Sequence, residues 1–491
     1  MEQPNIIFII TDQMRGDCLG ADGNRYIDTP NLDFIASRGT RFSHGYSAVP
    51  SCIPARASLW SGQDQWHAGV LGMGPGQPQI PNDYPHTMAG ELLDAGYHTH
   101  LVGKGHFHPF RAHMGFKTRD AEEAGIMSRR MHLDDYRRWF RRHAPPGVTP
   151  DDHGIDWNSW HARPWHTAEY LHPTAWSVTK ALNFLEKRDR EKPFFLNLSF
   201  HRPHSPYVPP EFFFNLYYHG KTPEPYIGTW SSMHDDPVTA SNPNAWRGDV
   251  GIKAVHTGRA GYYGEVSFID NQIGRLINWL HDYDKETYKN TWFIFTSDHG
   301  DMLGDHHLWR KTYPYEGSTR IPFIVSPPLG SDIAAGRPVA DEVVELRDIM
   351  PTVMEIAGLP VPETVTGRSV LPLLSGSDEN WRKYIHGEHC TCYSSEQEMQ
   401  YVTDGKRKYV WLPRTGIEQF FDLEQDPGEL NDLFQDPSRR EEVALWKGYL
   451  VDELESRDCG WVSDGSLKAD PGHLYSPYKE KRWNGNTRTS F

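Results

Sequence analysis

The sequence predicts an α/β fold: a large, mostly parallel sheet between layers of helices, followed by a smaller antiparallel sheet subdomain. Two observations predict it. Short apolar runs alternate with amphipathic helical patterns over most of the chain, as in proteins with parallel sheets. After about residue 378, β-rich arms flank the dipeptide Asp404-Gly405, which is typical of a hairpin. We therefore predict a main domain over residues 1–378 and an α+β subdomain over residues 379–491.

The elements of the main domain follow from local patterns. Apolar runs bounded by turn residues predict strands, and 3.6-residue periodicity predicts helices. Thr29, Pro30 and Gly39 supply the cap, first turn and stop of the first helix. The predicted strands cover residues 5–10, 97–103, 192–200, 291–297 and 320–326, and the predicted helices cover 29–39, 87–96, 172–189, 265–283 and 346–358.

Two further segments have sequence patterns of their own. Residues from about 105 to 165 lack a clear period and are rich in His, Arg, Trp and Asp, so we predict an insertion over the mouth of a site. In the C-terminal subdomain, the stretch "FFDLEQDPGELNDL" at 420–433 predicts a strand that passes into a helix.

Composition and charge exclude several classes of protein. The chain has 491 residues, of which 37% are hydrophobic, so it can bury a large core. Its net charge of −15 disfavours nucleic acid as a partner. No apolar run is long enough to cross a membrane. Five cysteines, with Cys390 and Cys392 too close for an ordinary disulfide, indicate a reduced chain. We expect a cytoplasmic location, or a periplasmic or secreted one if a signal peptide has been removed.

Polar side chains follow four of the predicted strands directly. They are Asp12 and Gln13, Lys104 and His106, His201, and Asp298 with His299. Each alone has an ordinary explanation as a turn residue, a surface lysine or a loop histidine. Because the carboxyl ends of parallel strands meet at one edge of a sheet, we expect these side chains to converge. Together they predict a site for a metal ion and an anion.

The stretch "CIPAR" at residues 52–56 raises a separate question about Cys52. A cysteine in an apolar stretch is most often a small buried hydrophobe. A reactive thiolate favours a nearby cation and a helix N-terminus, and Arg56 with the helix-like run that follows could supply both. The residues alone leave both interpretations open.

The motif resembles the C-x-P-x-R signature of the type I, formylglycine-dependent sulfatases of the alkaline phosphatase superfamily. The resemblance extends over nearly the whole chain, in the family's order. It includes "NIIFIITDQ", "LLDAGYHTHLVGKGHF", "TSDHGDMLGDH", "YEGSTRIPFIV" and "FFDLEQDPGELNDL". It implies an alkaline-phosphatase-like fold, with residues 1–378 as the catalytic domain.

The resemblance also implies roles for individual residues. Cys52 would be oxidised to formylglycine by a formylglycine-generating or radical maturation enzyme, and its hydrated aldehyde would attack the sulfur of a sulfate ester. Arg56 would steady the diol, and Lys104 and Lys311 would bind sulfate oxygens. His106 would act as base when the intermediate collapses. His201 would donate a proton or a hydrogen bond to the leaving oxygen. The implied metal ligands are Asp12, Gln13, Asp298, His299 and the modified Cys52, with Ca²⁺ expected first and Mg²⁺ or Mn²⁺ as alternatives.

The chain departs from the commonest pattern of the family at three positions. Gln13 and His299 stand where many sulfatases have aspartate and asparagine, but related phosphonate monoester hydrolases use the same two residues. Gly105 replaces a tryptophan. We therefore expect a sulfatase acting on a small sulfated substrate, a sugar first or an aryl sulfate. A phosphonate or phosphate ester hydrolase is the alternative. A catalytically silent ligand-binding homologue is disfavoured, because every position mapped carries a usable residue.

Overall fold

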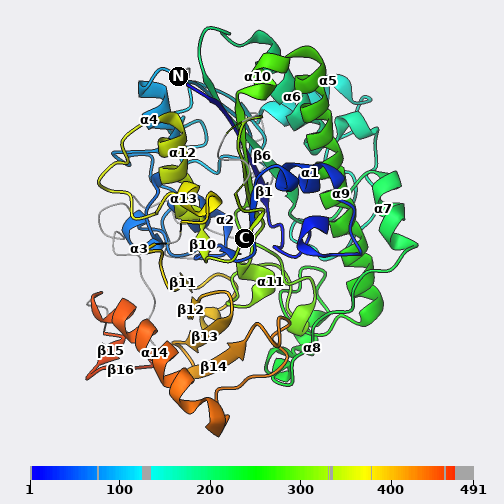
Figure 1. The fold of residues 1–491 in the computed structure, drawn as a ribbon. Helices are drawn as coiled ribbons and strands as arrows, with labels where there is room; N and C mark the ends of the chain where they lie inside the picture. Colours follow the sequence, from blue (N-terminus) through cyan, green and yellow to red (C-terminus); the bar gives the residue numbers. More distant parts are fainter. Residues whose placement is uncertain are drawn as a thin grey trace.

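The computed structural model describes residues 3–74, 77–123, 134–329, 331, 336–377, 379–457 and 460–469. An eight-stranded sheet crosses the molecule with helices on both faces, and a four-stranded antiparallel sheet lies at one end (Figure 1). The order of the large sheet is β5-β4-β6-β1-β7-β8-β2-β9. Its strands are β1 (Asn5–Asp12), β2 (Thr40–Phe42), β4 (His98–Gly103), β5 (Thr118–Ala121), β6 (Phe194–Pro203), β7 (Thr291–Ser297), β8 (Phe323–Ser326) and β9 (Val339–Ala340).

The helices lie in two layers that cover the sheet (Figure 1). One layer contains α1 (Pro30–Ser37), α6 (Pro173–Lys187), α7 (Glu211–Tyr218), α9 (Ile252–Tyr283) and α10 (Lys285–Lys289), and the other contains α2 (Cys52–Ser61), α4 (Met88–Asp94) and α12 (Ile349–Ala357). Shorter elements are α3 (Gln65–Ala68), α8 (Pro237–Ala240), α11 (Glu316–Thr319), α13 (Leu371–Leu374) and the strand pair β3 (Gly45–Tyr46) and β10 (Val344–Glu345).

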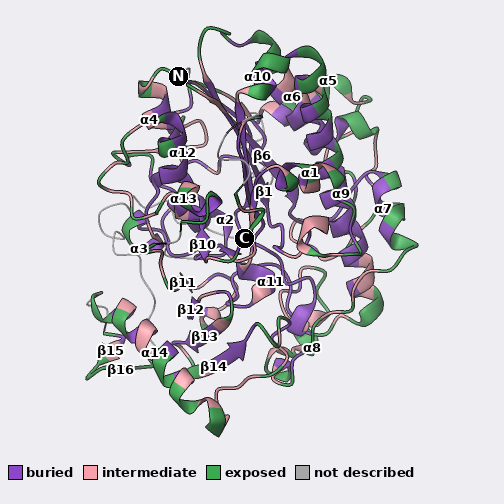
Figure 2. Cartoon of the chain, viewed as in Figure 1, coloured by how far each residue is buried: buried purple, intermediate pink, exposed green. Residues whose placement is uncertain are grey.

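Strand β1 occupies the middle of the sheet and is buried on both sides (Figure 2). Successive side chains of a strand point to opposite faces, so one strand can serve two cores. Ile7 and Ile9 join the apolar cluster that contains α1, α6 and α9, whereas Ile6 and Phe8 join the cluster under α2, α4 and α12. The unbroken apolar run at the N-terminus therefore belongs to a strand covered on both faces.

The predicted strands are all present, and their pairing sets up the site. Strands β4, β6, β1 and β7 are parallel neighbours, with Thr11 of β1 opposite Ser297 of β7. The carboxyl ends of these four strands thus meet at one edge. Strand β8 is antiparallel to β7, so the sheet is mixed.

Helix α9 is longer than predicted, because it begins at Ile252 rather than near residue 265. The added turns contain Gly258, Gly261 and Gly264, which have poor helix propensity and hide the helical pattern. These glycines lie where other segments pack closely: a Cβ on Gly261 would lie 2.9 Å from the Cβ of Tyr207. Tertiary packing thus stabilises a stretch whose local sequence does not predict a helix.

The segment at 105–165 contributes to the sheet as well as to the surface. Strand β5 pairs in parallel with β4 at the sheet edge, and α5 (Asp135–His143) follows it. Asp134 caps α5 by accepting a hydrogen bond from the amide of Arg137 at 2.7 Å. Residues 124–133 of this predicted insertion lie outside the described residues.

The C-terminal sheet consists of β11 (Ile385–His389), β12 (Met399–Thr403), β13 (Arg407–Leu412) and β14 (Ile417–Asp422), all antiparallel. The predicted hairpin at Asp404-Gly405 joins β12 to β13, and Gly405 has the positive φ of 86° that this turn needs. Helix α14 (Arg440–Glu455) packs on this sheet through Trp446 and Leu450. It begins at Arg440, so the prediction of a helix directly after β14 was wrong. The small pair β15 (Val462–Ser463) and β16 (Ser466–Leu467) follows.

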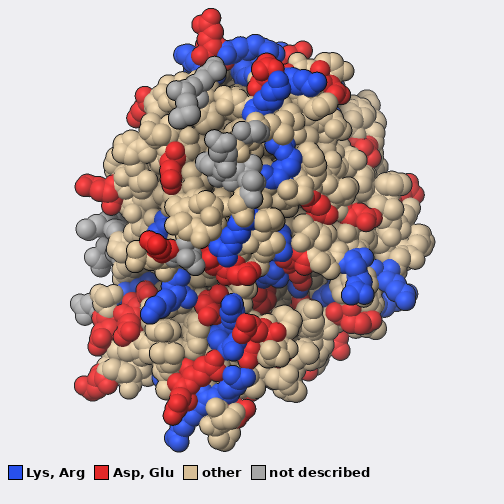
Figure 3. Space-filling view, viewed as in Figure 1, with Lys and Arg blue, Asp and Glu red and all other residues tan. Residues whose placement is uncertain are grey.

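Side chains of both charges lie on the surface (Figure 3), and the described cysteines are free thiols. On the face shown in Figure 3, acidic and basic side chains intermingle, most densely over the lower part where the C-terminal sheet lies. Cys18, Cys52, Cys390 and Cys392 are free thiols. Among the described residues, no helix has both the length and the apolar character needed to cross a membrane.

Candidate active site

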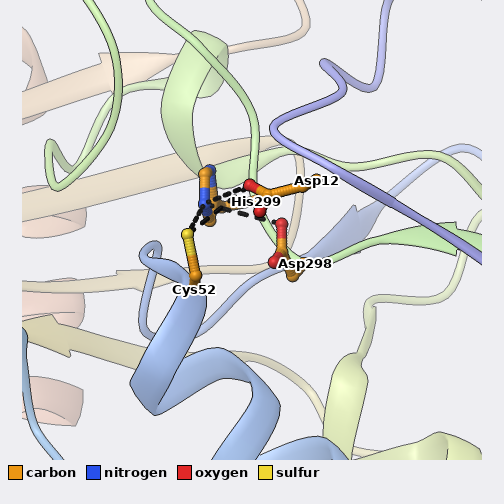
Figure 4. A group of neighbouring side chains, drawn as sticks. All are labelled: Asp12, Cys52, Asp298 and His299. Carbon is orange, nitrogen blue, oxygen red and sulfur yellow. Dashed lines mark hydrogen bonds and ion pairs between the residues drawn. The ribbon is translucent and has the colours of Figure 1, made fainter. Parts of the chain in front are cut away.

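Four side chains from separate parts of the sequence meet at the edge of the sheet (Figure 4). Asp12 ends β1, Asp298 and His299 follow β7 directly, and Cys52 is the first residue of α2. One ligand atom from each lies within 4.8 Å of those of the other three, and all four side chains are buried. The predicted convergence of these residues at one edge is thus present in the structure.

Cys52 lies at the centre of this group. The residue is 1% exposed, and its Sγ is 3.3 Å from His299 Nε2, 3.5 Å from Asp12 Oδ1 and 2.9 Å from Lys311 Nζ. Burial raises the pKa of the Cys52 thiol, but the surrounding cations, Lys104 and Lys311 foremost, bring it below the ordinary value. The position of Sγ is therefore one where negative charge is stabilised.

Three buried cations surround the cluster. Lys104 Nζ forms an ion pair with Asp12, and Arg56 Nε lies 2.9 Å from Asp298 Oδ2. Arg56 also donates to the carbonyl of Lys104 at 2.8 Å, which fixes the strand end that carries this lysine. Burial raises the pKa of the Asp12 carboxyl, but Lys104 and the other nearby cations hold it well below its ordinary value.

Gln13 has an environment that suits a metal ligand. Its backbone is left-handed, with φ of 76°, and its amide N–H donates to Asp298 Oδ1 at 3.1 Å. Its side-chain Nε2 donates to Asp301 Oδ2 at 2.5 Å. The remaining Oε1 is buried without a hydrogen-bond partner among the described residues, and such atoms usually have a partner. A carbonyl oxygen of this kind is a ligand that Ca²⁺ and Mg²⁺ accept.

The orientation of His299 supports the same conclusion. Its Nδ1 lies 2.8 Å from the carbonyl of Gly300, a contact that fixes the ring as in many metal-binding histidines. Nε2 then faces Asp12 Oδ1 at 3.4 Å and Asp298 Oδ1 at 3.5 Å. Two carboxylates, an imidazole nitrogen and the Gln13 oxygen together fit a divalent cation.

Of the two predicted histidines, His201 lies beside this centre, whereas His106 is placed on the loop after β4, two residues beyond Lys104. The amides of Gly105 and His106 both donate to Glu123 Oε1 at 2.7 Å, which holds the loop after β4. His201 is buried, and neither of its ring nitrogens has a hydrogen-bond partner in the part of the chain that the structure describes. Burial and Lys104 place the pKa of His201 well below its ordinary value, so the ring is neutral.

Several residues of the site were not predicted as members of it. His204 follows His201 in the same loop, and the ring of Trp157 stacks on both histidines at 5.1 and 4.9 Å. Burial and Lys311 lower the pKa of His204 well below its ordinary value. The local signals were a second histidine in "HRPHSP" and the place of Asp301 three residues after Asp298, behind the same strand. Glu123 gave no signal.

The C-terminal subdomain contacts the loop that leads into Cys52. Ser51 Oγ lies 2.7 Å from His389 Nε2, the amide of Glu388 donates to the carbonyl of Ala48 at 2.8 Å, and Tyr401 Oη donates to the carbonyl of Ser47 at 2.9 Å. The edge strand β11 and its neighbour therefore hold the backbone on which the candidate nucleophile stands.

Comparison with known proteins identifies the family. The family model "Sulfatase" matches residues 4–359, and the model "N-sulphoglucosamine sulphohydrolase, C-terminal" matches residues 304–455. An arylsulfatase of Clostridium perfringens is 42% identical over 477 residues, which cover 95% of this chain and 97% of the relative. A choline-sulfatase of Rhizobium meliloti is 30% identical, covering 89% and 83% of the two chains.

The fold agrees with this assignment. The crystal structure of the phosphonate monoester hydrolase of Agrobacterium radiobacter superimposes with a TM-score of 0.76 at 24% identity, covering 92% of this chain and 95% of that one. This likeness shows the alkaline-phosphatase-like architecture. Taken with the family model and the 42% identical relative, it shows that the chain belongs to the sulfatase family and is a sulfuric ester hydrolase.

Proposed function

We propose that this enzyme hydrolyses the sulfate monoester of a small alcohol through a formylglycine made from Cys52. The observation that carries the proposal is the position of Cys52 Sγ, 2.9 Å from Lys311 Nζ and within the cluster of Asp12, Asp298 and His299. A buried thiol in such surroundings marks the place where an anionic substrate meets its nucleophile. The hydrated aldehyde supplies one hydroxyl to bond sulfur and a second whose deprotonation releases sulfate.

Asp12, Gln13, Asp298 and His299 would hold a divalent cation, together with the modified Cys52. When bound, such an ion polarises the sulfate oxygens and favours ionisation of the diol. The carboxylates and the Gln13 carbonyl favour Ca²⁺, which we propose first. The imidazole of His299 is a softer ligand, which keeps Mg²⁺ and Mn²⁺ as alternatives.

The cationic side chains and histidines of the chain would bind the sulfate group and transfer protons. Lys104 and Lys311 bind sulfate oxygens and offset the charge that develops on them. Arg56, fixed by Asp298, orients the side chain at position 52. We propose His106 as the base that accepts the diol proton, and His201 as the donor to the leaving oxygen.

Maturation requires a second protein. Conversion of the Cys52 methylene thiol to an aldehyde is an oxidation in which the C–S bond breaks, the sulfur leaves as sulfide and a C=O bond forms. We propose that a formylglycine-generating or radical enzyme supplies the oxidant. We also propose the cytoplasm as the location and residue 378 as the boundary of the catalytic domain.

A specific observation favours a second candidate, a phosphonate or phosphate ester hydrolase. The structure superimposes on a phosphonate monoester hydrolase. Gln13 and His299 are two of the three positions where the chain departs from the commonest sulfatase pattern, and the resemblance gives both residues to phosphonate monoester hydrolases. Three buried cations suit either anion. The modified cysteine favours sulfate esters as substrates. Its second hydroxyl lets the covalent sulfo-enzyme expel sulfate, whereas a sulfated serine has no such hydroxyl.

The test compares matched substrates on fully modified enzyme. Mass spectrometry of the peptide around Cys52 measures the aldehyde, and kcat/KM is measured for nitrophenyl sulfate, nitrophenyl phosphate and a phenylphosphonate monoester. We expect the sulfate to be preferred, and Cys52→Ala and Cys52→Ser to lose multiple turnover while Cys18→Ala, at a buried thiol elsewhere, retains it. Preference for the phosphonate ester in a fully modified sample would select the second candidate.

A further inference from the structure

A cavity adjoins the candidate active site on the side of His201. It has a volume of about 210 Å³ and lies between the insertion, helix α5 and the loop after β6. Its lining includes Glu122, Tyr136, Asp151, Trp157 and His201. We call it the insertion pocket. His201 belongs both to this wall and to the surroundings of Lys104 and Asp12, so the pocket lies where the alcohol of a bound ester would extend.

One oxygen of a buried carboxyl group in the pocket lacks a hydrogen-bond partner in the part of the chain that the structure describes. Glu122 is 3% exposed, and its Oε2 has no hydrogen-bond partner within the described residues. Burial and the neighbouring Asp134 carboxylate raise the pKa of Glu122 to about 8. An unsatisfied buried carboxyl costs free energy in the empty pocket, and a ligand that brings a positive charge removes that cost.

The basic residues of the pocket are already occupied. Arg137 forms two hydrogen bonds with Asp151, at 2.6 and 2.9 Å. Arg202 Nη1 donates to the carbonyls of His204 and Pro206. Its Nε has no hydrogen-bond partner among the described residues but lies 3.6 Å from Glu265 Oε1 as an ion pair. Both guanidinium groups are thus paired in charge with carboxylates of the protein, so an incoming anion finds little unpaired positive charge.

The two histidines of the pocket, His153 and His201, add no charge, and the aromatic walls suit a cation. Burial and Arg202 lower the pKa of His153 to about 4, so its ring is neutral at pH 7. Tyr136 and Trp165 are buried in the wall, and the half-buried ring of Trp157 stacks on His201 at 4.9 Å. Aromatic faces attract organic cations, most strongly where water is excluded.

We propose that the insertion pocket receives the alcohol part of the substrate and selects alcohols that carry a positive charge, as an ammonium or quaternary ammonium group. This inference rests on the proposed sulfatase function. A bound cation favours the ionised form of Glu122, so the two halves of the loaded site are opposite in sign: lysines at the sulfate end, and Glu122 with aromatic rings at the alcohol end. The preferred ester is dipolar, the sulfate of an amino alcohol or an amino sugar, rather than an ester with a second anionic group.

The test uses pairs of esters that differ in charge but little in shape. The first pair is choline sulfate and 3,3-dimethylbutyl sulfate, and the second is glucosamine 6-sulfate and N-acetylglucosamine 6-sulfate. We expect kcat/KM to be about tenfold or more higher for the charged member, a fold-change that corresponds to one desolvated cation contact. A larger kcat/KM ratio in the first pair indicates that the preferred substrate is the ester of an amino alcohol. A larger ratio in the second pair indicates the ester of an amino sugar.

The variant Glu122→Gln keeps the shape of the pocket and removes the carboxylate. We expect it to reduce the ratio within the preferred pair to about threefold or less, whereas Glu186→Gln, at an exposed glutamate on α6, should leave the ratio as in the parent enzyme. Equal kcat/KM within both pairs, with nitrophenyl sulfate still hydrolysed, overturns the role of the pocket. If fully modified enzyme hydrolyses none of these esters, nitrophenyl sulfate included, the proposed function itself is wrong.

Discussion

Lys311 Nζ lies 2.9 Å from Cys52 Sγ, although 259 residues separate the two in the chain. Lys311 follows a loop that leaves β7, and Cys52 begins a helix on one face of the sheet. The contact puts a positive charge directly beside Sγ, the atom that an oxygen of the proposed formylglycine would replace. Since Lys311 is 3% exposed, its charge acts at low dielectric, where it is worth most.

Removal of this charge should therefore slow catalysis strongly. For Lys311→Ala we expect kcat/KM on nitrophenyl sulfate to fall by about 10²–10³-fold, the range found when one preorganised electrostatic contact is lost. Lys289→Ala, at an exposed lysine, is the control and should change it less than twofold. A Lys311→Ala enzyme of parental activity would exclude a role for this lysine in the reaction.

Metal removal should abolish turnover and leave the fold intact. The four proposed ligands lie at the edge of the sheet, so their loss does not open the apolar clusters on its two faces. We expect exhaustive chelation to remove activity without changing the far-UV circular dichroism. Adding Ca²⁺ back at about 100 times its Kd should restore activity and stabilise the protein by about 2.7 kcal/mol.

Parallel titrations with Mg²⁺ and Mn²⁺ rank the three ions by both readouts. Full activity in a sample shown by elemental analysis to contain no metal would contradict the assignment of Asp12, Gln13, Asp298 and His299.

The two stacked histidines should differ in their dependence on the leaving group. His201 lines the insertion pocket, and neither of its ring nitrogens finds a hydrogen-bond partner among the residues described. By contrast, His204 Nδ1 lies 2.7 Å from the carbonyl of Ser205. We expect His201→Ala to lose about tenfold more activity on an alkyl sulfate than on nitrophenyl sulfate, because only the alkyl alcohol needs a proton as it leaves. His204→Ala should affect both substrates alike. The reverse pattern would assign the donor role to His204.

The buried carboxyl of Glu122 should make stability depend on pH. Its pKa rises from an ordinary value near 4.5 to about 8 in the folded chain, so the folded state binds the proton more tightly than the unfolded state. The stability that comes from the protonated group is complete below about pH 4.5 and is lost as the pH rises through 8. Glu122→Gln, which stays neutral, should thus match the parent at pH 4.5 and exceed it in melting temperature at pH 8.5. A difference independent of pH would show that Glu122 is ionised throughout.

The sequence predicted β1, β4, β6, β7 and β8 of the large sheet, because each is an apolar run closed by turn residues. The strands β2, β5 and β9 were missed, because they are only two to four residues long and contain no extended apolar run. The sequence also predicted the meeting of Asp12 with Asp298, since both follow strands whose carboxyl ends share an edge. The start of α9 was missed because Gly258, Gly261 and Gly264 lower helix propensity, and only their packing against other segments reveals why glycine is needed there.

Residues of the site could be predicted only where a reactive side chain follows a predicted strand or belongs to a recognisable motif. Arg56 was recognised from its place in "CIPAR", but its ion pair with Asp298 depends on the distance between α2 and β7, which local sequence does not encode. The same holds for Glu123, which holds the amides of Gly105 and His106 from the far side of the loop. The insertion pocket combines residues from Glu122 to Pro206, and no spacing in the sequence indicates that they meet.

The contacts between β11 and the loop before Cys52 have a consequence for the order of events during synthesis. Ala48 and Ser51 are held by Glu388 and His389, more than three hundred residues later in the chain. In the folded chain Cys52 is 1% exposed. While the ribosome is still adding β11, these contacts to the loop before Cys52 are missing. We therefore expect the oxidation that we propose for Cys52 to be easiest before β11 docks, so slower translation of the last segment should raise the fraction of modified enzyme.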